Sequence, residues 1–141
     1  MAKGFTLLEV MITIVVILTI TGLAFPRISS TFDQIATDRA LGEVLSFYHD
    51  ARLAAIWRST AVEIEFGEDT LRATFKGLTD SLFVTAPGPQ AYGVQMVVSR
   101  QRIRIYPTGI GWGAANTKLV FTRGAAAESL TTSRLGRVKR W

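Results

Sequence analysis

An apolar segment near the start of the chain constrains the fold more than any other feature. Residues 5–25 are apolar, threonine or glycine apart from a single acid, Glu9. A helix rises about 1.5 Å per residue, so roughly 20 such residues span the hydrocarbon core of a bilayer. A carboxylate within such a segment is costly unless it is paired. The segment contains no cation, so we expect the partner of Glu9 to be a chain terminus or another molecule.

Three kinds of N-terminal segment fit this pattern. A cleaved secretory signal explains the basic Lys3 and the small residues near position 24, but its apolar core usually has only about 7–15 residues. A plain membrane anchor fits the length and leaves Glu9 unexplained. A cut between Gly4 and Phe5 instead creates an α-amine four residues before Glu9, on the same helical face. The amine of one copy would then neutralise Glu9 of a neighbouring copy.

Charge is distributed unevenly along the 141 residues. Residues 1–98 contain seven Lys/Arg and ten Asp/Glu, whereas residues 99–141 contain nine Lys/Arg and one Asp/Glu. Such asymmetry indicates a polyanionic or acidic partner, or a basic face that only aids solubility. The chain has no cysteine, which excludes disulfides and thiolate metal sites.

The periodicity of apolar residues predicts a long helix followed by strands. Steps of three and four favour one helix over residues 6–58, apolar all round at first, bent near Pro26 and amphipathic afterwards. Alternation then predicts strands at residues 62–66, 71–75, 92–98, 101–106, 118–122, 129–133 and 137–140. Residues 87–89 and 124–128 are expected to be loops. The expected fold is α+β, a long N-terminal helix packed on an antiparallel β-sheet.

Patterns for catalysis and metal binding are weak. His49 neighbours Asp50 on the predicted helix, but no nucleophile accompanies them, so we expect a surface position. Glu63 and Glu65 share a strand face that either binds a cation or is simply solvated, and solvation is favoured. The glycines at 109, 111 and 113 do not match a phosphate-binding loop. We therefore expect no enzyme activity, no cofactor and no metal.

Basic residues form two clusters in the C-terminal third. The larger cluster lies just before Trp141 and consists of Arg134, Arg137, Lys139 and Arg140. The smaller cluster contains Arg100, Arg102 and Arg104, and the last two alternate onto one strand face. Guanidinium groups suit phosphate oxygens, and a neighbouring aromatic ring can stack on a base. The larger cluster therefore predicts a basic edge that contacts neighbouring pilins or a secreted protein, with a DNA contact as the alternative.

Residues 3–10, which read KGFTLLEV, resemble the class III signal of type IV pilins and type II secretion pseudopilins. In that family a prepilin peptidase cuts after the glycine and methylates the new N-terminal phenylalanine. The resemblance assigns Gly4 and Phe5 to processing and N-methylation. It assigns Glu9 to subunit docking during assembly. Pro26 matches the helix-bending proline of the family.

Later segments resemble the GspH/FimT branch of type IV pilin-like minor pseudopilins, related to type II secretion system protein H. These segments are residues 51–56 (ARLAAI), 105–109 (IYPTG) and 136–140 (GRVKR). The last is similar to the Gly-Arg-x-Arg signature of FimT-like minor pilins that bind DNA, with Lys139 in place of the second arginine. Major pseudopilins usually carry an acidic calcium-binding loop, whereas Glu128 is the one acid in residues 99–141.

The resemblance implies a domain organisation and a function. It divides the chain into a leader (1–4), a membrane and filament-core helix (5–25), an amphipathic continuation (26–58) and a periplasmic β-sheet domain (59–141). The chain would be a single-pass inner-membrane subunit that initiates or caps a type II secretion pseudopilus or a type IV pilus and supports protein secretion. The alternative is a FimT-like minor pilin that binds DNA for uptake. Expected partners are other pilins or pseudopilins, prepilin peptidase, the inner-membrane assembly platform and membrane lipid, with DNA or a secreted protein in addition.

Overall fold

A computed structural model describes residues 4–77, 80–113 and 115–141, with the backbone alone at residues 23–26. The chain falls into two compact units, Met1–Phe32 and Asp33–Trp141. One helix, α1 (Leu7–Trp57), begins in the first unit and ends in the second. The predicted long helix is thus confirmed, whereas residues 1–3 of the expected leader lie outside the described residues.

The first unit is helical and exposes its side chains. All side chains described at residues 7–22 and 27–32 are exposed. By length and composition α1 contains a stretch that could cross a membrane, and none of this stretch is buried. Thr13 donates its hydroxyl to the carbonyl of Glu9 at 2.6 Å, and Thr21 donates to that of Ile17 at 2.8 Å. These hydroxyls are satisfied within the helix and need no water.

The helical backbone continues through Pro26. The side chains of residues 23–26 lie outside the described part of the chain, and the two units are not placed relative to each other. The bend that the sequence suggests at Pro26 therefore stays a prediction.

The second half of α1 is amphipathic, as the residue spacing predicts. Its buried positions recur at steps of three and four and include Ala40, Leu41, Val44, Phe47, Tyr48, Ala51 and Ala55. His49 is exposed, as expected. The buried face joins a single core cluster with side chains from the strands.

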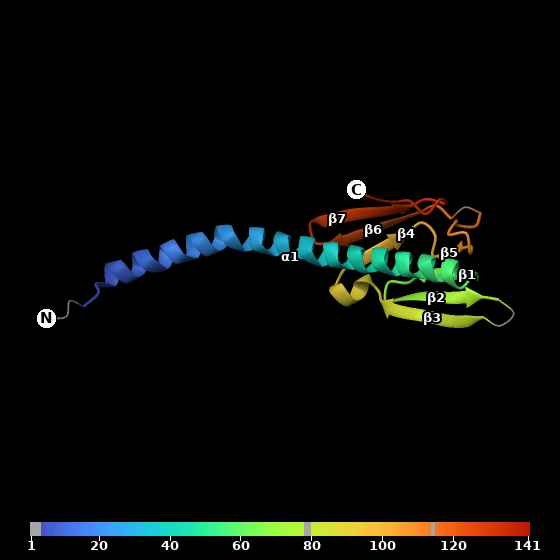
Figure 1. Cartoon of the computed structure of the whole chain (residues 1–141). Coiled ribbons are helices and arrows are strands. Elements are labelled where there is room, and N and C mark those ends of the chain that lie inside the picture. Colours follow the sequence, from blue (N-terminus) through green and yellow to red (C-terminus); the bar gives the residue numbers. More distant parts are fainter. Residues whose placement is uncertain (1–3, 78–79, 114) are drawn as a thin grey trace. The chain divides into compact units, whose positions relative to one another are not determined.

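The described strands form two antiparallel four-stranded sheets (Figure 1). The first has the order β3-β2-β1-β5, with β1 (Ala61–Phe66), β2 (Thr70–Lys76), β3 (Ser81–Pro87) and β5 (Arg102–Ile105). The second has the order β4-β6-β7-β8, with β4 (Gln95–Val98), β6 (Thr117–Arg123), β7 (Ala126–Thr132) and β8 (Val138–Arg140). A short 3₁₀ helix, η1 (Pro89–Tyr92), precedes β4.

Both sheets contribute to the same core as the second half of α1. Val62, Ile64 and Phe66 alternate inward from β1, and Leu119 and Phe121 do so from β6. The second half of α1 runs alongside strands of both sheets in Figure 1. The α+β prediction, a long helix packed on antiparallel strands, is therefore confirmed.

Several details of the predicted strands are wrong. The sequence does not predict β3, because residues 81–87 (SLFVTAP) show no alternation of apolar and charged residues. In the structure most of these side chains are exposed. Residues 124–128 are not all loop, since β7 already begins at Ala126. The strand expected from Tyr92 begins only at Gln95, after η1. Two sheets replace the expected single one, because alternation identifies a strand without identifying its neighbour.

Candidate assembly and nucleic-acid-binding surfaces

Glu9 lies in the first turn of α1. Thr6 precedes the helix, and its Oγ1 accepts a hydrogen bond from the backbone N–H of Glu9 at 3.2 Å. This is an N-cap, which satisfies one of the free donors at a helix start. The helix dipole also favours an acid in the first turn. The pattern Thr-x-x-Glu at residues 6–9 is the sequence signal for this cap, and reasoning from charge alone misses it.

Gly4 and Phe5 lie just before α1, in a segment without regular secondary structure. Phe5 is 82% exposed, and a Cβ at Gly4 would meet no atom within 4 Å. The described residues thus leave the peptide bond between them accessible. None of the ion pairs in the described part of the chain involves Glu9.

Two arginines of the smaller basic cluster are paired with carboxylates. Strands β1 and β5 are antiparallel, with Glu63 opposite Arg104 and Glu65 opposite Arg102. Nη2 of Arg104 lies 2.9 Å from Oε2 of Glu63, and Nη2 of Arg102 lies 2.7 Å from Oε1 of Glu65. Opposite charges directly across a sheet stabilise the pairing. The charges of these two arginines are therefore balanced within the fold.

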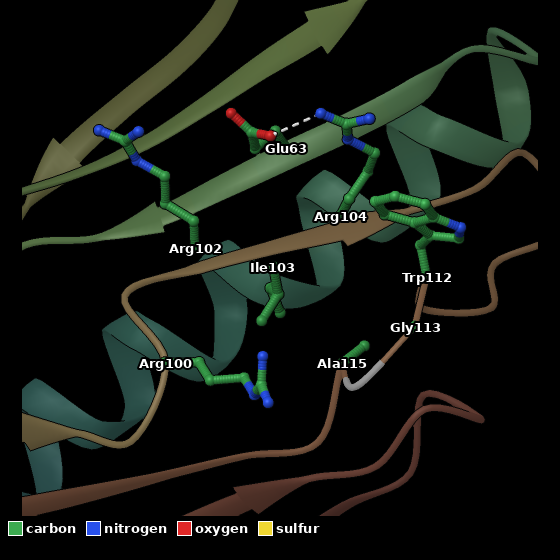
Figure 2. Close-up of a pocket in the computed structure, with 8 residues that line it drawn as sticks. All are labelled: Glu63, Arg100, Arg102, Ile103, Arg104, Trp112, Gly113 and Ala115. Atoms are coloured by element: carbon green, nitrogen blue, oxygen red, sulfur yellow. Dashed lines mark hydrogen bonds and ion pairs between the residues drawn. The ribbon is translucent and has the colours of Figure 1, made fainter.

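A hollow of about 280 Å³ lies along β5, and Figure 2 shows its lining. Arg102 and Arg104 project to the side of the strand that holds Glu63, whereas Arg100 lies on the other side. The Arg104 guanidinium also lies 5.5 Å from the ring centroid of Trp112. The three arginines do not converge on one point, so the hollow is a poor site for an anion.

Glu63 is an ion-pair partner within the sheet. Partial burial alone would raise its pKa, but hydrogen bonds with Arg104 and Lys76 outweigh burial and hold the pKa below its ordinary value. Lys76 Nζ lies 3.4 Å from Oε1 of Glu63. Both carboxylates are thus already paired with basic side chains, which argues against the alternative that Glu63 and Glu65 bind a metal cation. Among the described residues, no group of three or more His, Cys, Asp or Glu side chains comes together.

Arg140 is tied into the fold. Its guanidinium contacts Asp38 on α1 and both carboxylate oxygens of Glu128 on β7, the latter at 2.6 Å. The hydrogen bonds with Glu128 raise the pKa of Arg140, which partial burial alone would lower. Two carboxylates already accept from its Nε and Nη2. Arg140 therefore holds β8 against α1 and β7, and it is poorly placed to bind a phosphate.

A tight turn at residues 133–136 precedes β8. The N–H of Gly136 donates to the carbonyl of Ser133 at 2.9 Å, and Gly136 has a left-handed φ of 77°. Arg52 Nε on α1 donates to the carbonyl of Gly109 at 2.9 Å, and its Nη1 reaches that of Gly136 at 3.4 Å. A Cβ at Gly136 would lie 2.5 Å from Cζ of Arg52. The left-handed φ and the close approach of Arg52 both favour glycine at this position.

The remaining predicted DNA-binding residues are exposed. Arg134, Arg137 and Lys139 make no ion pair within the described residues. Nζ of Lys139 lies 3.4 Å from the ring centroid of Trp141. We call Arg134, Arg137, Lys139 and Trp141 the C-terminal basic surface. The structure separates them from Arg140, which the sequence places in the same cluster.

Comparisons with known proteins agree with the motif and the fold. Residues 1–25 match the model of the prokaryotic N-terminal methylation motif. The fold is similar to a crystal structure of the type IV minor pilin FimU from Pseudomonas aeruginosa (strain PAO1), with a TM-score of 0.60, 12% identity, and coverage of 79% of this chain and 89% of FimU. A crystal structure of FimU in a second space group has a TM-score of 0.59 and 12% identity, and the match covers 77% of this chain and 91% of FimU. No curated protein matches the sequence.

The chain has a type IV pilin-like fold and begins with the N-terminal methylation motif. At 12% identity the likeness to FimU concerns the fold alone, and the methylation motif is an independent match within the first 25 residues. The motif together with a minor-pilin fold agrees with the expectation that the chain is not an enzyme. The motif and the long apolar helix also fit a membrane-anchored protein.

Proposed function

We propose that this pilin-like protein is a minor subunit of the GspH/FimT type that helps initiate or cap a type II secretion pseudopilus or a type IV pilus. The observation that carries the proposal is the methylation motif at the head of an exposed apolar helix. A prepilin peptidase cuts between Gly4 and Phe5 and methylates Phe5. Residues 5–25 then hold the subunit in the inner membrane, with residues 59–141 in the periplasm, until the assembly platform moves it into the filament.

Glu9 is the assembly contact in this proposal. Cleavage creates an α-amine at Phe5, four residues before Glu9 and therefore about one helical turn away. The amine of one subunit neutralises Glu9 of its neighbour as their helices pack. The position of Glu9 in the first turn supports this role, because the acid lies at the level of the chain terminus. A bend at Pro26 would set how the packed helices leave the filament core.

Leader removal can be tested with a matched pair of glycine variants. A Cβ would meet no atom within 4 Å at either Gly4 or Gly22, so neither substitution creates a clash in the fold. We expect Gly4→Leu to leave the leader attached and Gly22→Leu to be processed normally. The intact mass of each chain, purified from cells with prepilin peptidase, measures this. A mature chain that begins elsewhere than Phe5 would contradict the proposal.

The role of Glu9 can be separated from its role in the helix cap. The cap uses the backbone N–H of Glu9, so Glu9→Gln removes the charge and keeps the cap. We expect this variant to be processed but excluded from filaments, as measured by its content in purified filaments. Glu68→Gln, which changes an exposed acid in the turn after β1, is the control. Equal incorporation of both variants would remove Glu9 from assembly.

DNA binding through the C-terminal basic surface is the second candidate function. It is supported by three exposed cations, one of which, Lys139, lies over the exposed ring of Trp141. Because Arg140 is held by Asp38 and Glu128, three phosphates are the most this surface would neutralise. The slope of log K against log salt for duplex binding is then expected near −2.7.

The salt dependence can be tested with two double variants. We expect Arg137→Ala with Lys139→Ala to reduce the slope to about −0.9, since one phosphate contact remains. Arg102→Ala with Arg104→Ala is the control, because both arginines are already paired with carboxylates. No detectable binding by the full chain at low salt would rule out this function.

A further inference from the structure

A groove of about 600 Å³ lies between α1 and β3. Its walls are mostly apolar: Leu53 and Trp57 contribute from α1, and Phe83 and Ala86 contribute from β3. Trp57 is 83% exposed, which is unusual for the largest apolar side chain. Strand β3 forms the edge of its sheet and carries no charge that would discourage a partner. We call this feature the apolar groove.

Two acids line the apolar groove on the helix side. Glu43, Asp50 and Trp57 follow one another at intervals of seven residues, which places them on one stripe of α1. Neither acid makes an ion pair within the described residues. The one basic residue of the lining, Arg58, lies over the ring of Phe75, 5.0 Å from its centroid. The groove therefore suits an apolar side chain flanked by cations.

The turn at residues 133–136 presents such a side chain. Leu135 is 62% exposed at this turn, with Arg134 before it and Arg137 after it. The backbone N–H of Arg134 donates to Oδ1 of Asn116 at 2.6 Å, and that of Arg137 donates to Oγ of Ser133 at 3.1 Å. With the contact from Arg52 to Gly136, these bonds fix the turn in advance. A preorganised loop loses less conformational entropy on binding.

The turn and the groove lie on opposite flanks of the second half of α1. Successive helix residues are rotated by about 100°, so Arg52, which contacts the turn, lies roughly 160° around α1 from Asp50, which lines the groove. In Figure 1, β3 and the C-terminal segment also lie on opposite sides of this helix. One molecule therefore cannot place its own turn in its own groove.

We propose that the apolar groove of one molecule receives the Leu135 turn of a second copy of this chain. Leu135 enters between the two walls, and Arg134 and Arg137 approach Glu43 and Asp50. The contact joins two different surfaces, so it is heterologous and leaves a free groove and a free turn at the two ends. Such a contact adds copies in one direction. It extends the proposed assembly role from the N-terminal helix to the unit Asp33–Trp141.

Cysteine cross-linking tests the contact directly, because the chain contains no native cysteine. Full-length Leu53→Cys and Leu135→Cys chains are purified in detergent, mixed and oxidised. We expect the disulfide-linked heterodimer to exceed either homodimer at least tenfold. Val97→Cys, at a 69% exposed position on β4, replaces Leu53→Cys in the control mixture, which should give background yield.

Charge reversal sharpens the same experiment. In the cross-linking background, Glu43→Lys with Asp50→Lys should lower the heterodimer yield about tenfold. Arg134→Glu with Arg137→Glu on the other chain should restore it. A yield equal to the Val97 control, a dominant Leu53–Leu53 homodimer, or no response to charge reversal would overturn the proposal. Failure here leaves processing between Gly4 and Phe5 unaffected, so it is distinguishable from failure of the proposed function.

Discussion

The two halves of α1 contain similar apolar residues but differ in what covers them. Ile14 and Leu18 in the first half are more than 50% exposed, whereas Leu41 and Val44 in the second half are at most 2% exposed. The described residues thus leave the first half uncovered, whereas the second half builds the core of its own unit. Helix formation alone does not determine which side chains are covered, since the strands that follow decide it.

A pair of truncations should separate the two halves most strongly. Leu41→Ala is expected to lower the free energy of unfolding by about 2–5 kcal/mol, because it leaves a cavity in the core. Ile14→Ala should change it by less than about 0.5 kcal/mol. All three tryptophans lie in the second unit, so their fluorescence during denaturant unfolding in detergent reports on that unit. Equal effects would show that the first half also supports the fold.

The contact between Arg52 on α1 and the turn at residues 133–136 should give the next largest effect. Gly136→Ala is expected to cost about 1–3 kcal/mol, because φ is left-handed and the new Cβ meets Arg52. Gly113→Ala shares the left-handed φ, at 60°, but meets no atom within 4 Å. It should cost about 1 kcal/mol from backbone strain alone. Similar losses in both variants would mean that the contact with Arg52 contributes nothing.

Arg140 should contribute less, because its side chain is half exposed. Arg140→Ala removes contacts with both Asp38 and Glu128, and we expect a loss of about 1 kcal/mol. Arg137→Ala, which breaks no ion pair within the described residues, should be neutral. Thermal denaturation of the two variants at low and high salt measures the difference. A loss for Arg140→Ala that salt does not reduce would argue against an electrostatic contact.

The smallest effect should be the pH dependence due to Glu63. Its pKa is lowered in the folded state, so its stabilising contribution is present above its unfolded pKa of about 4.3 and is lost as pH falls through the lower folded value. We expect Glu63→Gln to remove less than about 1 kcal/mol at pH 7 and nothing at the lowest pH. Unfolding curves from pH 7 to 2 test this sign. A variant penalty that grows on acidification would contradict it.

Local patterns predict much of this fold from sequence. Alternation at residues 62–66 and 71–75 identifies β1 and β2, and steps of three and four identify the buried face of α1. The N-terminal motif predicts the family model that residues 1–25 match. Each of these signals depends on neighbours within one element, where sequence spacing and spatial spacing coincide.

Features that depend on pairing between distant segments are not predicted. Arg102 and Arg104 read as a free basic cluster, because nothing in the sequence states that β5 pairs with β1 and brings Glu63 and Glu65 opposite them. Arg140 reads as one of four equivalent cations, although contacts with α1 and β7 distinguish it. The alternation of acids on β1 and of arginines on β5 was the one available signal for the pairing of these strands. No local signal in the sequence indicates the contacts of Arg140.

The contact between Asp38 and Arg140 has a consequence for how the chain folds. It joins residues 102 positions apart, and the entropy lost in closing a loop grows with its length. The β1–β2 hairpin closes over only a few residues and forms from local contacts. We therefore expect β8 to dock after the hairpins have formed. A fold completed by contacts so distant in sequence should form more slowly than a helical bundle of equal length.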